Sequence, residues 1–120
     1  MTLTFSRFQK AAEQRQQALN HSLGGWSLLE WSGAMCGEAG EVANVCKKIT
    51  RTRQGIGGAW AERDRDEKSL LEDLSYEIGD VIAYLSLLAS AAGLDLGSCA
   101  AVKFDIISEH AGWSGERLSP

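Results

Sequence analysis

Apolar residues recur at the three- and four-residue spacing of amphipathic helices along most of the chain. A first helix is predicted from about Leu3 to about Asn20, where apolar residues alternate with glutamines and charged residues. Its apolar stripe consists of Phe5, Phe8, Ala12 and Leu19. The glycines of Leu23-Gly24-Gly25 interrupt the pattern and predict the end of this element.

A second helix is predicted from near Ser27 to near Thr50. Ser27 suits the N-cap, and Glu30 stands three residues later, as a capping box requires. The residues expected to face the core are Leu28, Met35, Val42, Val45 and Ile49. Residues 52–66 carry three glycines and many charges without a helical period, so they predict a mobile loop with Trp60 as its apolar anchor.

The third predicted helix, from about Glu67 to Ala92, has the strongest apolar period in the sequence, and Gly93 is well placed to end it. Its stripe comprises Leu71, Leu74, Ile78, Val81, Ile82, Leu85 and Leu88. Asp95 is the expected cap of a fourth helix from Leu96 to about His110, closed by Gly112. The inward residues expected on it are Val102, Ile106 and Ile107.

Four helices with mostly short connections predict an all-α fold, with residues 1–120 forming one domain as an antiparallel four-helix bundle. Strands are not expected, because the alternation of β-branched and aromatic residues that is typical of them is missing. The length of 120 residues allows one hydrophobic core and is too short for two.

The formal net charge of −4 and the lack of a long basic run argue against a protein that grips polymeric nucleic acid. The sequence contains no stretch of 18 apolar residues and no signal-peptide pattern near Met1, so we expect a cytoplasmic protein without a membrane partner. The odd number and wide spacing of Cys36, Cys46 and Cys99 predict reduced, buried thiols rather than disulfides or a zinc site.

Two acidic pairs stand out within the predicted second and third helices. Glu38 and Glu41 are three residues apart, as are Glu77 and Asp80. Residues at this spacing share one helix face, with Cβ atoms about 5–6 Å apart. If the two helices pack antiparallel with these faces opposed, four carboxylates converge.

Such a cluster needs a positive partner, because burying like charges costs several kcal/mol per ion unless they are compensated. These segments contain neither a basic side chain to supply it nor a histidine that would favour a transition metal. An all-oxygen site suits Mg²⁺ or Mn²⁺.

Glycines Gly37, Gly40 and Gly79 beside the carboxylates each cost about 1 kcal/mol in a helix interior relative to alanine. Close helix approach, or room for a ligand, would explain them. Either acidic pair alone would be ordinary solvated helix surface; the two pairs together, each flanked by apolar residues and glycine, favour the metal site.

The segments Gly37-Glu38-Ala39-Gly40-Glu41-Val42 and Tyr76-Glu77-Ile78-Gly79-Asp80-Val81 resemble the E-x-x-E and E-x-x-D motifs of the MazG-like all-α nucleotide pyrophosphohydrolases. This superfamily also includes dCTP pyrophosphatases, dimeric dUTPases and phosphoribosyl-ATP enzymes. The likeness covers about residues 22 to 118, including the segment 101–105, which resembles the last core helix of the family.

The resemblance implies Mg²⁺-dependent hydrolysis of a nucleoside triphosphate to a monophosphate and pyrophosphate, in house-cleaning of the nucleotide pool. The four acidic residues would be the metal ligands and the catalytic groups. The resemblance also implies assembly as a homodimer or as a dimer of dimers, a homotetramer.

Several further residues are tentative contacts for the substrate. Tyr84, one turn after Asp80, resembles a residue that lines the base pocket of relatives that hydrolyse dCTP, and it could equally belong to the core. Lys103 and Asp105 fall where relatives place polar residues near the phosphates or sugar, or they snorkel from a helix flank.

Trp26 and Trp31 could stack on a base or pack within the fold. Lys48 belongs to a basic group with Lys47, Arg51 and Arg53, which could attract phosphates. Favourable placement of cations at a helix C-terminus is the other explanation for this group.

The sequence departs from the family pattern in two ways. Thirty-five residues separate Glu41 from Glu77, which is more than is usual among relatives. Gly37 stands where some relatives have an additional glutamate proposed as the base that activates water, so one of the four carboxylates, or metal-bound hydroxide itself, would have to serve.

Three alternatives stay open. The substrate could be restricted to dUTP or dCTP, or it could be phosphoribosyl-ATP. The chain could also be a non-catalytic helical module whose acidic patch binds a basic partner.

Overall fold

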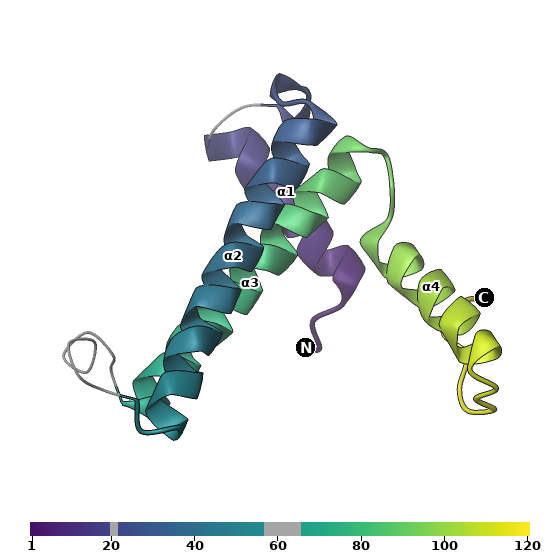
Figure 1. The fold of residues 1–120 in the computed structure, drawn as a ribbon. Helices are drawn as coiled ribbons and strands as arrows, with labels where there is room; N and C mark the ends of the chain where they lie inside the picture. The colour runs from purple at the N-terminus through teal and green to yellow at the C-terminus, as the bar shows by residue number, and fades with distance from the viewer. Residues whose placement is uncertain (20–21, 57–65) are drawn as a thin grey trace. The chain divides into compact units, whose positions relative to one another are not determined.

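The computed structural model describes residues 1–19, 22–56 and 66–120, and within these ranges it contains helices and no strand. The all-α prediction is therefore confirmed. The elements are α1 (Phe5–Leu19), the short 3-10 turn η1 (Leu23–Gly25), α2 (Leu28–Arg53), α3 (Glu67–Ala91) and α4 (Leu96–His110), drawn in Figure 1.

The helices group into two compact units. The first comprises Met1–Leu28 with Leu85–Pro120, and the second comprises Leu29–Tyr84. The first unit thus holds α1, α4 and the end of α3, and the second holds most of α2 and α3. The arrangement of all four helices as one antiparallel bundle, and as one domain, stays a prediction.

In the second unit α2 and α3 run antiparallel, side by side (Figure 1). Near the end of α2, Val45 and Ile49 form a buried cluster with Leu70, and Leu74 packs against it. Near its start, the ring of Trp31 lies 6.5 Å from that of Tyr84, late in α3. Since the residue numbers rise along one helix and fall along the other, these contacts fix the register of the pair.

Capping groups explain where the helices of the second unit end. Gly55 follows α2 with φ of +67°, a conformation that favours glycine. Asp66 caps α3, because the backbone amide of Ser69 donates to its carboxylate at 3.0 Å. An exposed ion pair between Arg53 and Glu67 joins the end of α2 to the start of α3.

The loop expected over residues 52–66 is only partly described. α2 continues to Arg53, three residues beyond the predicted end near Thr50, and Asp66 belongs to the cap of α3. The rest of the expected loop, with its anchor Trp60, lies largely outside the described residues.

In the first unit a buried amide joins α1 to the corner between α3 and α4. The side-chain amide of Gln9 donates to Ser90 Oγ at 3.0 Å and to the carbonyl of Leu94 at 2.8 Å. The backbone amide of Leu96 donates to Gln9 Oε1 at 2.8 Å. One side chain therefore satisfies polar groups at the end of α3, in the corner and at the start of α4.

The predicted end signals of α3 and α4 are confirmed. The Asp95 carboxylate accepts a hydrogen bond of 2.7 Å from the amide of Ser98, so Asp95 is the N-cap of α4. Gly93 and Gly112 both have φ of +71°, the left-handed conformation expected of a glycine that follows a helix.

The prediction that Val102, Ile106 and Ile107 face inward is wrong for the single chain, since all three are exposed. α4 instead buries Leu96 and Ser108. Other members of the predicted stripes are exposed as well: Phe5, Leu19, Leu28, Leu71, Ile78 and Leu85. The apolar stripes are wider than the faces that packing covers within the chain.

The cysteines are free thiols, as predicted, but all three are exposed, so their predicted burial is wrong. Cys46 shows why: it directly follows the buried Val45 and therefore points about 100° away from the packed face of α2. Apolar neighbours in the sequence do not place a residue on the apolar face of a helix.

No single helix in the described ranges combines the length and apolarity that crossing a membrane would need. Taken together, α3 and α4 reach such a length and composition, but the chain bends between them.

Candidate metal centre

Three carboxylates converge in the second unit: Glu38 from α2, and Glu77 and Asp80 from α3. One oxygen of each lies within 4.8 Å of the others. The spacing of three residues puts Glu77 and Asp80 on one face of α3. The antiparallel register, fixed by the contacts at either end of the helix pair, brings Glu38 opposite them.

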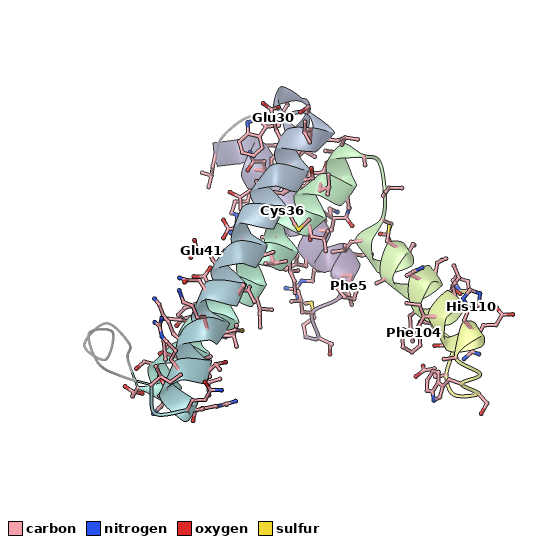
Figure 2. The ribbon with its side chains drawn as sticks, in the orientation of Figure 1. Phe5, Glu30, Cys36, Glu41, Phe104 and His110 are labelled. Carbon is pink, nitrogen blue, oxygen red and sulfur yellow. The ribbon has the colours of Figure 1, made fainter. Side chains whose placement is uncertain are left out.

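Glu41, the fourth predicted ligand, lies one turn further along α2 and is exposed; Figure 2 labels it on that helix. It is outside the group of three converging oxygens. Its charge nevertheless acts on the site, because Glu41 raises the pKa of Glu77. It therefore stands beside the other three as an electrostatic neighbour.

The pKa of Glu77 is raised above its ordinary value of 4.5. Partial burial is the largest cause, followed by the negative charges of Glu41, Asp80 and Glu38. Each of these disfavours the ionised form of Glu77. Every effect on the pKa of Glu77 thus comes from burial or from repulsion by like charges, and a bound cation would offset both.

The donor set of this group fits a hard divalent cation. All three converging side chains offer carboxylate oxygen, the ligand type that Mg²⁺ and Mn²⁺ prefer. Glu38 and Glu77 are half-buried, while Asp80 is exposed. An ion held here would therefore keep an open side for water or for substrate oxygens.

The glycines beside the carboxylates do not mediate close packing within the chain. A Cβ atom added at Gly37, Gly40 or Gly79 would meet no atom within 4 Å. Close helix approach is therefore wrong as their explanation here. The open space beside the backbone leaves the other explanation, room for a ligand, standing.

Tyr84 and Trp31, two of the tentative substrate contacts, form an aromatic pair with rings tilted by 47°. Trp31 is 2% exposed, so packing occupies most of its surface, whereas Tyr84 is half-buried. Tyr84 lies one turn beyond Asp80 on α3, so the pair adjoins the acidic group. The contact between these two rings was not predicted from the sequence. It could have been, because the antiparallel register that places Glu38 opposite Glu77 also places Trp31 opposite Tyr84.

Lys48 is half-buried on α2, seven residues after Glu41. Seven residues are close to two helical turns, so the two side chains share a face and are about 10 Å apart along the axis. Of the other basic residues of that group, Arg53 pairs with Glu67.

The remaining tentative contacts, Trp26, Lys103 and Asp105, belong to the first unit. Trp26 and Lys103 are exposed. The Asp105 carboxylate accepts hydrogen bonds from the backbone amides of Leu118 and Ser119. Asp105 therefore has hydrogen-bond partners in the C-terminal tail, which its sequence context does not predict.

Comparison with known proteins adds one relative. The chain is 41% identical over 56 residues to the "Gene 37 protein" of Mycobacterium phage L5, a name that states no activity. The match covers 47% of this chain and 41% of the phage protein. No protein-family profile matches the chain, and no solved structure does.

Proposed function

We propose that the protein is a Mg²⁺-dependent nucleoside triphosphate pyrophosphohydrolase, which converts a (d)NTP and water to the (d)NMP and pyrophosphate. Mn²⁺ would serve in place of Mg²⁺. The observation that carries the proposal is the convergence of Glu38, Glu77 and Asp80 on one point between two antiparallel helices. Carboxylates on an ordinary solvated helix surface repel one another, so nothing would favour their convergence on one point.

The chemistry of the site supports a polyanionic substrate. A bound divalent ion supplies neutralisation of the triphosphate charge and activation of water. The residues of the chain would hold that ion, with Glu38, Glu77 and Asp80 as ligands and Glu41 adding negative charge beside them. An acidic protein with a net charge of −4 thereby binds an anion through a cation.

The open backbone at Gly40 and Gly79 supports a ligand beside the carboxylates. Tyr84, half-buried and packed against the buried Trp31, offers an aromatic surface for a base near the metal ligands. Lys48, further along the same face of α2 as Glu41, is a candidate for phosphate contact. A substrate restricted to dUTP or dCTP, or phosphoribosyl-ATP, would use the same site.

The proposed enzyme works as a homodimer or homotetramer. The support is the set of apolar side chains that the single chain leaves exposed on α4, among them Val102, Ile106 and Ile107. Apolar side chains left exposed along one helix are candidates for an interface with a second copy.

The test is a screen of the purified protein against standard and modified (d)NTPs with Mg²⁺ or Mn²⁺, measuring pyrophosphate, monophosphate and orthophosphate separately. We expect pyrophosphate and monophosphate in equal amounts. Asp80→Asn should lower the rate by at least about tenfold to a hundredfold, since it removes a charged metal ligand and loss of even an outer-shell partner of a metal costs that much. Glu72→Gln, which changes an exposed carboxylate on the same helix, should leave the rate unchanged.

Orthophosphate as the product would contradict cleavage between the α and β phosphates. Unchanged Mg²⁺ and Mn²⁺ affinity of Glu38→Gln and Asp80→Asn in a calorimetric titration would remove the metal centre altogether. The acidic patch would then be better explained as the docking surface of a non-catalytic module for a basic partner.

A further inference from the structure

The chain reverses direction after α4 and returns along it. The amide of Trp113 donates to the carbonyl of Ser108 at 2.9 Å, and Gly112 takes the left-handed conformation that the turn needs. Figure 1 shows the C-terminus lying beside α4 rather than beyond its end. The returning segment comprises residues 113–119.

The Asp105 carboxylate on α4 accepts three hydrogen bonds from the end of this segment. Its Oδ1 accepts from the amide of Leu118 at 2.9 Å, and its Oδ2 accepts from the amide of Ser119 at 2.8 Å. The Ser119 hydroxyl also donates to Oδ2. Both oxygens are engaged, and bonds to an ionised acceptor are stronger than those between neutral groups.

The Arg117 guanidinium forms hydrogen bonds within the segment. It donates to the carbonyl of Trp113 at 2.8 Å and to that of Gly115 at 3.2 Å, and its carbon lies 5.8 Å from the centre of the Trp113 ring. The cation also helps to lower the pKa of Asp105, after the larger effects of the hydrogen bonds from Ser119 and Leu118.

The segment also holds an aromatic contact. The Trp113 ring meets Phe104 edge to face, with centroids 5.5 Å apart and planes at 87°. Figure 2 labels Phe104 on α4. Together with Ile107, Ser108 and Ala111, the two rings line an apolar cup of about 240 Å³.

We propose that residues 113–119 are a strap that Asp105 latches onto α4, and that the latch keeps the end of the strap, Leu118 and Ser119, against this helix. The start of the strap is held separately, by the hydrogen bond of the Trp113 amide and by the contact of its ring with Phe104. Asp105 is then an anchor for the tail, because its carboxylate oxygens are already engaged. This inference is independent of the proposed activity and concerns the first unit alone.

Trypsin provides the test, because the strap contains the peptide bond between Arg117 and Leu118. In the latched state the Arg117 side chain is bound within the strap, and the amide of that bond donates to Asp105. We expect Asp105→Asn to accelerate loss of Leu118–Pro120 about tenfold or more, followed by mass spectrometry, since a neutral amide can accept only part of the bonds.

Asp95→Asn is the matched control. It makes the same substitution at the N-cap of α4, where asparagine also caps well, so the rate of tail loss should equal that of the unaltered chain. Equal rates for Asp105→Asn and the unaltered chain would overturn the latch. So would tail loss from the unaltered chain as fast as from a free peptide of residues 111–120.

Amide hydrogen exchange tests the strap without any substitution. The amides of Leu118 and Ser119 should exchange at least tenfold more slowly than in the free peptide, because both are hydrogen-bonded to Asp105. Exchange at the rate of the free peptide would overturn the proposal, even if Asp105→Asn failed to fold.

Discussion

Glu77 is the residue of the acidic group whose pKa is raised by the charges of the other three carboxylates. It is half-buried, and three neighbouring carboxylates disfavour its ionised form. Protonation of Glu77 and binding of a cation both reduce the repulsion among these carboxylates in the folded protein. Both therefore affect its stability.

The metal-free protein should lose stability as the pH rises from about the ordinary Glu77 pKa of 4.5 through its raised value in the folded state. In this window the folded protein retains a proton that the unfolded chain has released, so raising the pH favours unfolding. The measurement is the midpoint temperature of thermal unfolding, with a chelator present, for the unaltered chain and for Glu77→Gln at each pH. As the pH rises through the window, the midpoint of the unaltered chain should fall relative to that of Glu77→Gln.

A difference that stayed constant with pH would contradict the electrostatic coupling. At pH 7, adding Mg²⁺ should raise the unfolding midpoint of the unaltered chain and leave that of Glu77→Gln almost unchanged. This second comparison separates cation binding from general salt effects, which would act on both proteins alike.

At the scale of residues, the sequence predicted which carboxylates could meet but missed contacts between distant polar groups. The spacing of Glu77 and Asp80 is a local property, so it could be read directly. The three hydrogen bonds of Gln9 and the latch of Asp105 link positions far apart in the chain or in an irregular tail, and such contacts leave no periodic pattern.

At the scale of elements, the register of α2 against α3 positions the site. The cluster of Val45, Ile49 and Leu70 holds one end of the pair. Leu70 is 1% exposed, whereas the adjacent Leu71 is 44% exposed, although the apolar period predicts Leu71 and not Leu70 for the core stripe. A broad apolar stripe does not identify which of its members faces a particular neighbour.

Leu70→Ala should therefore lower the free energy of unfolding by about 2–5 kcal/mol, as expected for a large-to-small change in a core. Leu71→Ala, the same substitution at the next position, should cost less than about 1 kcal/mol in the monomer. Denaturant titration checks both. Equal losses would mean that the helix pair does not pack in the register described.

Gly79→Ala should stabilise α3 by about 1 kcal/mol, because a methyl group gains helix propensity and enters open space. The same substitution should weaken nucleotide binding if that space admits the ligand. Urea titration and a binding titration on one variant test both effects. Lower stability instead would show that another group occupies the space beside this glycine.

At the scale of the whole molecule, the sequence predicted the type and approximate bounds of the four α-helices that lie within residues 1–19, 22–56 and 66–120. It did so because each helix carries its own period and end signals, as Asp95, Gly93 and Gly112 illustrate. It could not predict which side of α4 packs, since the apolar residues of that helix occupy more than one face.

The exposed side of α4 gives a prediction about assembly. Placing a charge at Ile107 should weaken the proposed self-association, so Ile107→Lys should raise the dissociation constant about tenfold or more in sedimentation velocity. Glu109→Lys introduces the same side chain two positions away on an exposed polar site and should have a smaller effect. A chain that sediments as a monomer at high concentration would contradict the assembly.

The packing of α2 against α3 also determines where the chain can gain or lose residues without disturbing the acidic group. Insertions in the segment that joins α2 to α3 leave the facing residues of both helices in place, since side-chain packing sets their alignment. A single-residue deletion between Glu41 and Val45 would instead turn Glu38 by about 100° relative to the buried cluster. Viable insertions and deletions should therefore accumulate between the two helices, while the number of residues within each helix stays unchanged.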